Sequence, residues 1–407
     1  MKHFLTWACL CLVLTACHKD KNEPDPAPTP TIADRTVLVY VAGENSLSKY
    51  YNSELQEMRD GMKQVGSNNH LLLYVDIADS RRKPYLLEVS AEDTVTVYQY
   101  NEGSLARDPD QMLEVINRAF ALHPAKSYGL TLWGHASGWL INTDSVSHTM
   151  TARRGAYGID NGSNSTSNNG KWMNIPTLSK VLSRTAKPLA FIFADCCNFQ
   201  CAEVAYELRH AADYIIGAPS EIPGVGAPYN TLVPAMFSSD AQFYRQMADA
   251  YFAQVIASHE VPLSVVKTSE MENLAQATRT VLKSFAAQFG SGYPDMSGLI
   301  YYLGNPWSNN FKVMYDMNDF ILHYASKDEY TAWRQAFDRA VVYSKMSTRW
   351  ETASLVNFSD FTVTAERYGG ISMFAPQPPG NIVYADYNQR IRQMGWYYAA
   401  GYADIGW

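Results

Sequence analysis

Short apolar runs and longer helical repeats alternate along the first half of the chain. Runs such as Tyr128–Trp133 and Leu189–Ala194 are mostly apolar instead of alternating with polar residues, which is typical of strands that are covered on both faces. Segments with helical spacing lie between these runs, so the pattern predicts an α/β sheet layered between helices. The predicted strands are Thr36–Ala42, His70–Ile77, Tyr85–Val89, Thr94–Tyr100, Tyr128–Trp133, Leu189–Ala194 and Tyr214–Gly217, and the predicted helices are Ser46–Gln64, Asp108–His123, Ile175–Thr185 and Ala202–Ala212.

Longer helices dominate the pattern after Tyr229. A single strand-like stretch, Gly370–Ala375, interrupts them. The chain is therefore predicted to divide into a core over residues 34–230 and a mostly helical C-terminal subdomain over residues 231–407 that packs on this core. The predicted helices of the second half are Ala241–His259, Glu270–Phe289, Met314–Ala325, Tyr330–Ser344 and Tyr387–Tyr398.

One long polar stretch differs from the rest of the first half. Residues 142–174 are rich in Ser, Asn, Gly and Thr and have neither a helical nor a strand period. The pattern predicts an exposed loop, and loops of this length in compact domains often have a function.

The first sixteen residues have the pattern of an export signal. Lys2 is followed by an almost wholly apolar run from Phe4 to Ala16, which is too short to span a membrane and is typical of a signal peptide. The run ends in Leu-Thr-Ala-Cys17, which resembles the lipobox of bacterial lipoproteins, whose cysteine receives a diacylglycerol. An ordinary secretory signal that is cleaved after Ala16 is the alternative.

Residues 17–33 are predicted to be a lipidated cysteine and a linker. The stretch after Cys17 has proline at positions 24, 26, 28 and 30 and almost no apolar side chain, so it cannot bury enough surface to fold. Proline stiffens it into a tether on the order of 50 Å long, at about 3.1 Å per residue. We therefore expect a lipid-anchored protein of the cell envelope, on the outer membrane and facing the periplasm or the cell surface.

The net charge and the spacing of the cysteines exclude some classes of function. The 407 residues have a formal net charge of −7, whereas a nucleic-acid-binding protein needs a basic surface, so no nucleic-acid partner is predicted. Cys196, Cys197 and Cys201 lie within six residues of one another, although a disulfide framework would distribute its cysteines along an exported chain. The cluster indicates either a reactive site or a buried apolar patch.

Two predicted strand ends carry a histidine and a cysteine. His135 follows the strand that ends at Trp133, and Cys197 follows the strand that ends at Ala194. In an open α/β sheet, the loops at the C-terminal ends of the strands form the crevice where ligands bind. A nearby imidazole lowers the pKa of a thiol and activates it as a nucleophile, and backbone N–H groups in the turn at His135 could stabilise an oxyanion. A structural histidine and an inert buried cysteine are the alternative.

A series of short motifs runs in order through most of the chain after the linker. These motifs are Leu132–Trp139, Asp195–Leu208, Tyr214–Gly217, Glu221–Gly224, Ala227–Tyr229, Tyr315–Phe320 and Gly370–Phe374. They resemble the clostripain family of cysteine peptidases, which are relatives of caspases, legumains and gingipains. The resemblance implies a caspase-like α/β/α sandwich with a C-terminal, mostly helical subdomain.

The resemblance also implies a role for each matched residue. His135 matches the catalytic histidine, which mainly protonates the leaving amine, and Cys197 matches the nucleophile of the family's Asp-x-Cys pattern. Asp195 matches an acidic residue in the pocket for a basic P1 side chain. Ala136 stands where the family usually has glycine and keeps the backbone N–H for an oxyanion. Val225 replaces a usually acidic or amide residue, which predicts a softer preference for Arg or Lys.

These features together predict a lipoprotein cysteine endopeptidase that hydrolyses proteins or peptides after Arg or Lys through a Cys197 acyl-enzyme. Family members are often zymogens that cut themselves between the catalytic histidine and cysteine. Here that interval holds the loop of residues 142–174, with Arg153, Arg154 and Lys171 as candidate cleavage sites. A catalytically weak or inactive lipoprotein of the same fold, acting as a binding module, is the alternative.

The sequence offers little for a metal or cofactor. It contains no zinc-binding spacing, so no metal ligand is assigned, and calcium is the one cofactor retained as a candidate. Asp316 with Asp319 could bind calcium, although helix capping is the simpler interpretation. The predicted partners are peptide substrates and, through the N-terminal lipid, a membrane, and the chain is predicted to be a monomer.

Overall fold

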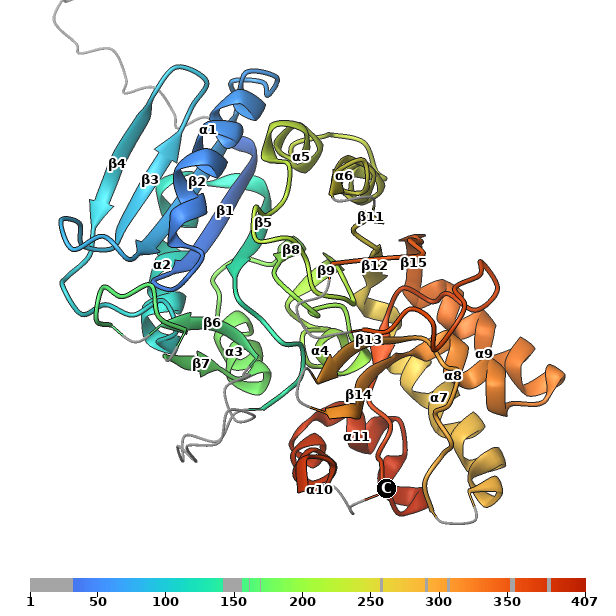
Figure 1. Ribbon diagram of the computed structural model, residues 1–407. Coiled ribbons are helices and arrows are strands. Elements are labelled where there is room, and N and C mark those ends of the chain that lie inside the picture. The colour runs from blue at the N-terminus through green and yellow to red at the C-terminus, as the bar shows by residue number, and fades with distance from the viewer. Residues whose placement is uncertain are drawn as a thin grey trace, which may run out of the picture. The chain divides into compact units, whose positions relative to one another are not determined.

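A nine-stranded mixed sheet runs through the computed structural model of the protein (Figure 1). The structure describes residues 32–141, 156–160, 162–168, 170–256, 259–289, 292–305, 308–351, 356–378 and 382–407. Ala33–Trp407 forms one compact unit. From one edge of the sheet to the other, the strands are β15 (Val341–Lys345), β12 (Leu263–Lys267), β9 (Ala212–Gly217), β8 (Leu189–Asp195), β5 (Ala125–Gly134), β1 (Ala33–Gly43), β2 (Asn69–Ile77), β3 (Tyr85–Val89) and β4 (Thr94–Gln99).

The five central strands, β9, β8, β5, β1 and β2, run parallel to one another. Two further strands close each edge of the sheet in antiparallel pairings. Parallel neighbours need a crossover connection that returns the chain to the same end of the sheet, and helices usually supply it. The C-terminal ends of all five parallel strands therefore lie at one end of the sheet, and His135 and Cys197 follow two of these strand ends.

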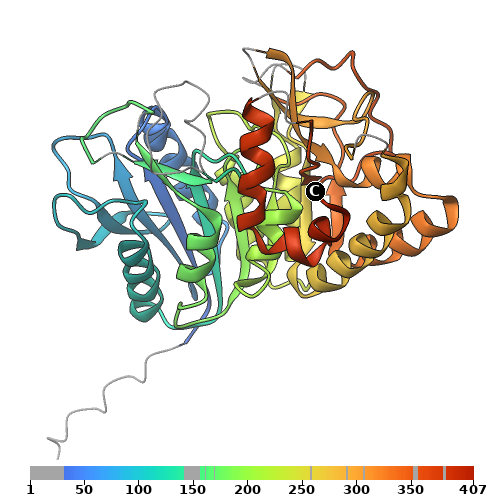
Figure 2. The ribbon, with the colours of Figure 1, turned by 90° about the horizontal axis from the view of Figure 1, so that it is seen from below.

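Strand β1 explains why its sequence is apolar at consecutive positions. Val37, Val39 and Val41 are buried in a hydrophobic layer on one face of the sheet, and Leu38 and Tyr40 are buried on the other. Full burial of a side chain of this size contributes about 1.5–3 kcal/mol. Figures 1 and 2 show helices on both faces of the sheet. The first layer holds α1 (Tyr51–Met62), α5 (Tyr229–Met236) and α6 (Phe243–Phe252), and the second holds α2 (Pro109–Leu122), α3 (Ile175–Leu182), α4 (Ala202–Glu207), α7 (Met271–Phe285) and α9 (Lys327–Ala340).

Local sequence signals start two of these helices. Asp108 precedes α2 and accepts hydrogen bonds from the backbone N–H groups of Asp110 and Gln111, and proline occupies the first helical position. Ser326 and Glu329 form a reciprocal capping box at the start of α9. Such caps satisfy backbone donors that have no partner within the helix, and each is worth about 1 kcal/mol.

After residue 230 the chain is mostly helical, but it also supplies strands. Strands β12 and β15 extend the main sheet, and a second, three-stranded sheet is formed by β13 (Tyr301–Asn305), β14 (Ser308–Asp316) and β16 (Ser372–Met373). The division of the chain near residue 230 stays a proposal. The remaining elements are α8 (Met317–Tyr324), α10 (Ile382–Arg390), α11 (Gly395–Ala399), β10 (Val255–Ile256), β11 (His259–Glu260) and the short 3-10 helices Ser48–Tyr50, Thr268–Glu270, Ala286–Gln288, Ile391–Gln393 and Tyr402–Ile405.

Several predicted helices of the second half differ from the structure. The first three residues of the helix predicted over Met314–Ala325 belong to β14, and the helix predicted over Tyr387–Tyr398 is divided between α10, a 3-10 turn and α11. The helix predicted over Tyr330–Ser344 ends at Ala340, and the next five residues form β15, which pairs with β12. The helix predicted over Ala241–His259 ends at Phe252. The sequence pattern also missed β12. Strands of five residues are too short to show a clear period, and their pairing with distant partners decides their conformation.

The prediction of a loop without strands over residues 142–174 was wrong for its described part. This part contains a hairpin of β6 (Tyr157–Asp160) and β7 (Lys171–Met173). Strands of four and three residues cannot show a recognisable alternation. An isolated bridge between Ala136 and Tyr157 ties the hairpin to the loop that follows β5. Residues 142–155, and with them Arg153 and Arg154, lie outside the described residues.

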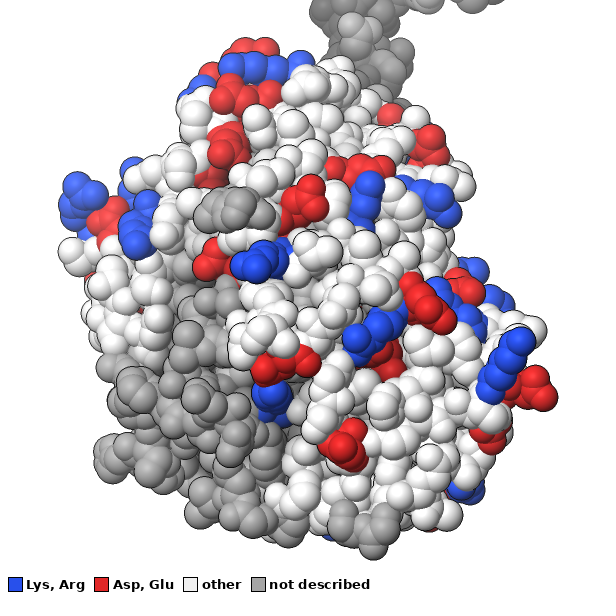
Figure 3. Space-filling model, turned by 45° about the vertical axis from the view of Figure 1, so that its right-hand side comes forward, with Lys and Arg blue, Asp and Glu red and all other residues white. Residues whose placement is uncertain are grey.

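In the part of the chain that the structure describes, no helix combines the length and the apolar character that crossing a membrane requires. Residues 1–31, which include Cys17, lie outside the described residues. On the face shown in Figure 3, acidic and basic side chains are interspersed. Oppositely charged neighbours partly cancel one another at a distance, so the described residues on this face form no broad patch of one sign.

Candidate active site

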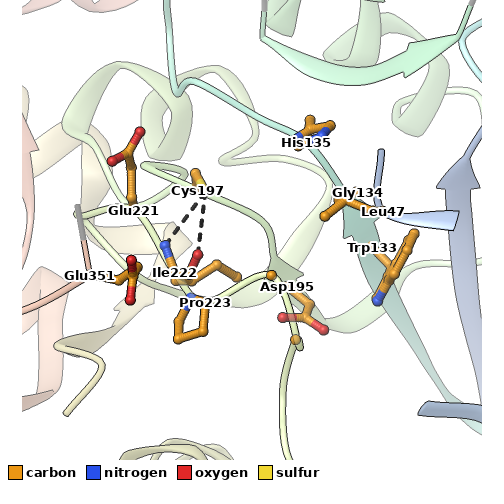
Figure 4. Close-up of a pocket in the computed structure, with 12 residues that line it drawn as sticks. Leu47, Trp133, Gly134, His135, Asp195, Cys197, Glu221, Ile222, Pro223 and Glu351 are labelled. Carbon is orange, nitrogen blue, oxygen red and sulfur yellow. Dashed lines mark hydrogen bonds between the residues drawn. The ribbon is translucent and has the colours of Figure 1, made fainter. Parts of the chain in front are cut away.

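The two sequence motifs with chemistry meet because their strands are neighbours in the sheet. Strands β5 and β8 run parallel, with Trp133 opposite Asp195. The C-terminal ends of both strands therefore lie at the same end of the sheet. Residue 135 therefore follows one strand end and residue 197 the adjacent one (Figure 4). Both side chains line a pocket of about 270 Å³. The lining residues are Leu47, Trp133, Gly134, His135, Asp195, Cys197, Glu221, Ile222, Pro223, Gly224, Gly226 and Glu351.

Cys197 differs from its two cysteine neighbours in exposure. It is half-buried and lines the pocket. Its Sγ accepts a hydrogen bond from the backbone nitrogen of Ile222 at 3.5 Å and lies 3.9 Å from the carbonyl oxygen of the same residue (Figure 4). Cys196 and Cys201 are 1% and 0% exposed. Burial raises the pKa of both thiols well above its usual range. A reactive thiolate is therefore disfavoured at these two positions.

His135 is held by two polar side chains that the sequence analysis missed. Its Nε2 lies 2.9 Å from the hydroxyl oxygen of Ser46, and the side chain of Asn168 is also hydrogen-bonded to it. Ser46 follows β1, so a third neighbouring strand end contributes to the site. Its place just after a predicted strand was a signal that could have identified it. Asn168 lies between β6 and β7, and no local pattern distinguished it.

The imidazole of His135 is neutral near pH 7. Burial lowers its pKa to about 4, although the hydrogen bond that the imidazole makes to the side chain of Asn168 partly offsets this effect. Desolvation disfavours the charged form of a histidine. A neutral imidazole can accept the proton of a thiol and pass it on to a leaving amine.

Ala136, the predicted oxyanion donor, follows the pocket residue His135 but is itself buried and is not one of the residues that line the pocket. Ala136 forms a bridge with Tyr157 in which the hydrogen bonds are made by the flanking residues, from Gly158 N to His135 O and from Ser137 N to Ala156 O. The bridge therefore does not use the N–H of Ala136 itself. Gly134 has a φ of +149°, and a Cβ there would lie 2.9 Å from the carbonyl oxygen of Ala42. Only glycine fits at that position.

Asp195 forms part of the pocket wall and is held in place by three donors. Its side chain accepts hydrogen bonds from Tyr229 Oη at 2.8 Å, from the backbone nitrogen of Ala227 at 3.1 Å and from Tyr251 Oη at 3.4 Å. Burial raises the pKa of this carboxyl to about 6, while all three donors oppose the shift. Asp195 is therefore mostly ionised at pH 7, at the base of a pocket that contains no fixed positive partner among its lining residues.

A second buried carboxyl, Glu54 of α1, lies beside Asp195. Its Oε2 accepts a hydrogen bond from the indole nitrogen of Trp133, and burial together with the charge of Asp195 raises its pKa to about 10. The sequence analysis missed this residue. A signal was present, because Glu54 lies on the same helical face as the buried Tyr51 and Met58, where a charged side chain is unusual.

The remaining predicted site residues lie elsewhere. Lys171 is exposed at the start of β7, opposite Asp160. The side chain of Val225 is 46% exposed, and the pocket is lined instead by the glycines on either side of it. Arg153, Arg154 and Cys17 are outside the described residues.

The candidate ion ligands have protein partners. Asp316 accepts hydrogen bonds from the backbone nitrogen of Asp319, where it caps α8, and from Tyr302 Oη. Asp319 pairs with Arg367 at 2.6 Å. These contacts match the helix-capping interpretation.

Among the described residues, one group of side chains is close enough to hold a metal ion, namely His70, Glu88 and His123. The two imidazoles stack at 3.9 Å, and each bonds one oxygen of the same carboxylate. His70 is near the start of β2, so the group lies at the opposite end of the sheet from the pocket.

Comparisons with known proteins agree with this geometry. The sequence model of the Clostripain family matches residues 39–404. No curated protein sequence matches the chain. Among solved structures, the chain is similar to a secreted C11 cysteine protease from Bacteroides thetaiotaomicron in complex with an irreversible peptide inhibitor, at 29% identity and a TM-score of 0.71, covering 91% of this chain and 100% of that one. It is also similar to an inactive zymogen C11 protease from Parabacteroides distasonis, at 27% identity and a TM-score of 0.74, covering 91% and 99% of the two chains.

Proposed function

This chain belongs to the clostripain family and is a cysteine peptidase, and from that premise we propose that it cleaves protein substrates after Arg or Lys, with Cys197 as the nucleophile. The observation that carries the proposal is the common pocket of Cys197, His135 and Asp195. Cys197 is the half-exposed member of a cysteine cluster whose other two thiols are buried. A nucleophile has to reach both its substrate and its proton acceptor.

The proposed reaction has two halves. The Cys197 sulfur attacks the scissile carbonyl carbon after its proton passes to neutral His135, and the N–H of Ala136 stabilises the oxyanion. Collapse of this intermediate breaks the C–N bond, His135 protonates the leaving amine, and the acyl group remains on Cys197 as a thioester. Water then attacks the thioester, which releases the carboxylic acid and restores the thiol.

The preference for a basic P1 side chain follows from the charge of the pocket. Three carboxyl groups line it, those of Asp195, Glu221 and Glu351, and its lining contains no Lys or Arg among the described residues. Asp195 is 3% exposed, so a cation that reaches it is screened little by water. A partly desolvated carboxylate would strongly favour Arg or Lys over a neutral side chain.

A panel of peptides that differ only in P1 tests this function. We expect wild-type kcat/KM to be highest for Arg or Lys, and we expect Asp195→Asn to lower it about 30-fold or more for these residues. For basic P1 alone, wild-type kcat/KM should fall as the pH drops through about 6, because Asp195 then loses its charge. A neutral P1 preference in the wild type would contradict the proposed specificity.

Self-processing in the segment after His135 is part of the proposal. The hairpin of β6 and β7 is bonded to the His135 loop through Gly158 N and through Asn168, so a cut near the hairpin could alter the position of the imidazole. Arg153 and Arg154 are favoured over Lys171, because Lys171 lies in a paired strand and proteolysis concentrates in loops. The similarity to a protein described as an inactive zymogen supports this step.

The N-terminal features support a lipid anchor on Cys17 and a position in the cell envelope, with the folded part acting as a monomer on protein substrates. A similar protein is described as secreted, which agrees with export. Cys17→Ser should move the protein from the membrane fraction to the soluble fraction, because the proposed diacylglycerol is lost. Fractionation followed by immunoblotting measures this shift, and Cys11→Ser, within the predicted signal, is the matched control. Unchanged fractionation of Cys17→Ser would contradict the anchor.

A further inference from the structure

We propose that Glu54 of helix α1 is a second specificity-determining carboxyl group, which binds the basic P1 side chain together with Asp195. This inference rests on the proposed preference for Arg or Lys. Glu54 comes from a helix on one face of the sheet, whereas Asp195 ends strand β8. Asp195 and Gly226 line the pocket, and the carboxyl group of Glu54 lies directly behind this part of the wall, next to Gly226.

Gly226 shows how close the two carboxyl groups lie. It lines the pocket and has a φ of +70°. A Cβ added there would lie 2.8 Å from Glu54 Oε1 and 3.1 Å from Asp195 Oδ2. Both oxygens therefore border the space that is left by the missing side chain of this glycine. A P1 side chain that enters the pocket as far as Gly226 would reach them together.

One carboxyl oxygen of Glu54 is free to bind a ligand, because the described residues offer it no hydrogen bond. Glu54 is 2% exposed, and its Oε2 is bonded by Trp133. Its Oε1 is buried and has no hydrogen-bond partner among the described residues. An unsatisfied buried polar atom is costly, so such an atom often marks a place where a ligand completes the bonding. A guanidinium with five N–H donors, or an ammonium with three, supplies the missing donor.

Binding of a basic side chain should change the protonation of Glu54. In the empty pocket, burial and the neighbouring Asp195 keep Glu54 protonated, with a pKa of about 10. A bound cation favours the ionised form of an adjacent carboxyl. Binding of Arg or Lys should therefore release about one proton to solvent at neutral pH. A neutral side chain of the same shape should release none.

Glu54 also has a structural contact, because its bond with Trp133 joins α1 to β5. Glu54→Gln separates the two roles, since glutamine keeps an oxygen acceptor for the indole but cannot carry a negative charge. Asp60→Asn is the matched control. It removes one carboxyl from the same helix at the surface, where Asp60 pairs with Lys63 at 2.6 Å.

The experiment compares peptides with Arg and with citrulline, its neutral isostere, at P1. Glu54→Gln should lower the Arg-to-citrulline ratio of kcat/KM about tenfold, while Asp60→Asn keeps the wild-type ratio. An unchanged ratio in Glu54→Gln would overturn the inference and leave the proposed function standing. A wild type without preference for Arg would instead refute the proposed function.

Proton release gives a second readout that does not need a Glu54 variant. In the wild type, binding of a tripeptide that ends in Arg, a cleavage product that is not cut further, is measured calorimetrically in buffers of different ionisation enthalpy. We expect release of about one proton for Arg and none for citrulline. Binding of Arg without proton release would overturn the role of Glu54 even if Glu54→Gln failed to fold.

Discussion

Cys197→Ala is expected to lower kcat/KM for peptide hydrolysis by at least about 10⁴-fold, because removal of a catalytic nucleophile abolishes the covalent route. The structure gives a physical reason for choosing this cysteine, since it is the half-exposed one that lines the pocket. Cys196→Ala and Cys201→Ala serve as matched controls and should retain most of the activity, because both thiols are buried and have raised pKa values. Initial rates with a basic P1 peptide measure the effect.

Labelling with a basic-P1 acyloxymethyl ketone provides an independent readout for the same variants. The probe should modify the wild type and both controls but not Cys197→Ala. Loss of labelling in Cys196→Ala instead would show that the nucleophile had been placed one residue too late. A wild type that neither hydrolyses peptides nor reacts with the probe would favour the inactive binding protein.

The same variant tests self-processing. Purified wild type should consist of two associated fragments, with a new end after Arg153 or Arg154, whereas Cys197→Ala should remain one chain. Mass spectrometry of the fragment ends measures this directly. A fully active wild type that is uncut would rule out activation by cleavage.

His135→Ala is expected to lower kcat/KM by about 10²–10⁴-fold, the usual contribution of a general acid or base. The imidazole shares the pocket with Cys197 and is held there by Ser46 and Asn168. The loss should be partly restored by added imidazole, because the substitution leaves a space of that shape. The matched control is His123→Ala, which removes a half-buried histidine at the opposite end of the sheet.

The pH profile distinguishes two roles for His135. Its pKa is lowered to about 4, so the imidazole is neutral above that value and protonated below it. If the neutral form accepts the thiol proton, activity on a neutral P1 peptide falls as the pH drops through about 4. A rate that rises as the pH approaches 4 would show instead that the protonated imidazole is required from the start. Activity above a tenth of wild type in His135→Ala would contradict either role.

The sequence was sufficient for features that depend on local pattern. Consecutive apolar residues in β1, β5 and β8 predicted strands covered on both faces, and both faces of the sheet are packed with helices. The family and the α/β fold were predicted correctly, because the motifs keep their order along the chain. His135 and Cys197 could be identified as a candidate pair because each directly follows a strand, and parallel strands end at one edge of a sheet.

Other features depended on contacts between segments that are distant in the sequence. Strands β12 and β15 are short and take their conformation from pairing with each other, so the local pattern could not reveal them. The sequence analysis took Val225 as the loss of an acidic or amide residue from the pocket, because the sequence motif covers only the loop that contains Val225. The second carboxyl beside Asp195 belongs to Glu54, 141 positions earlier in the chain, and reaches it from a different layer of the fold. Local periodicity records which face of a helix is buried, but the group that this face meets is set by the packing of the whole chain.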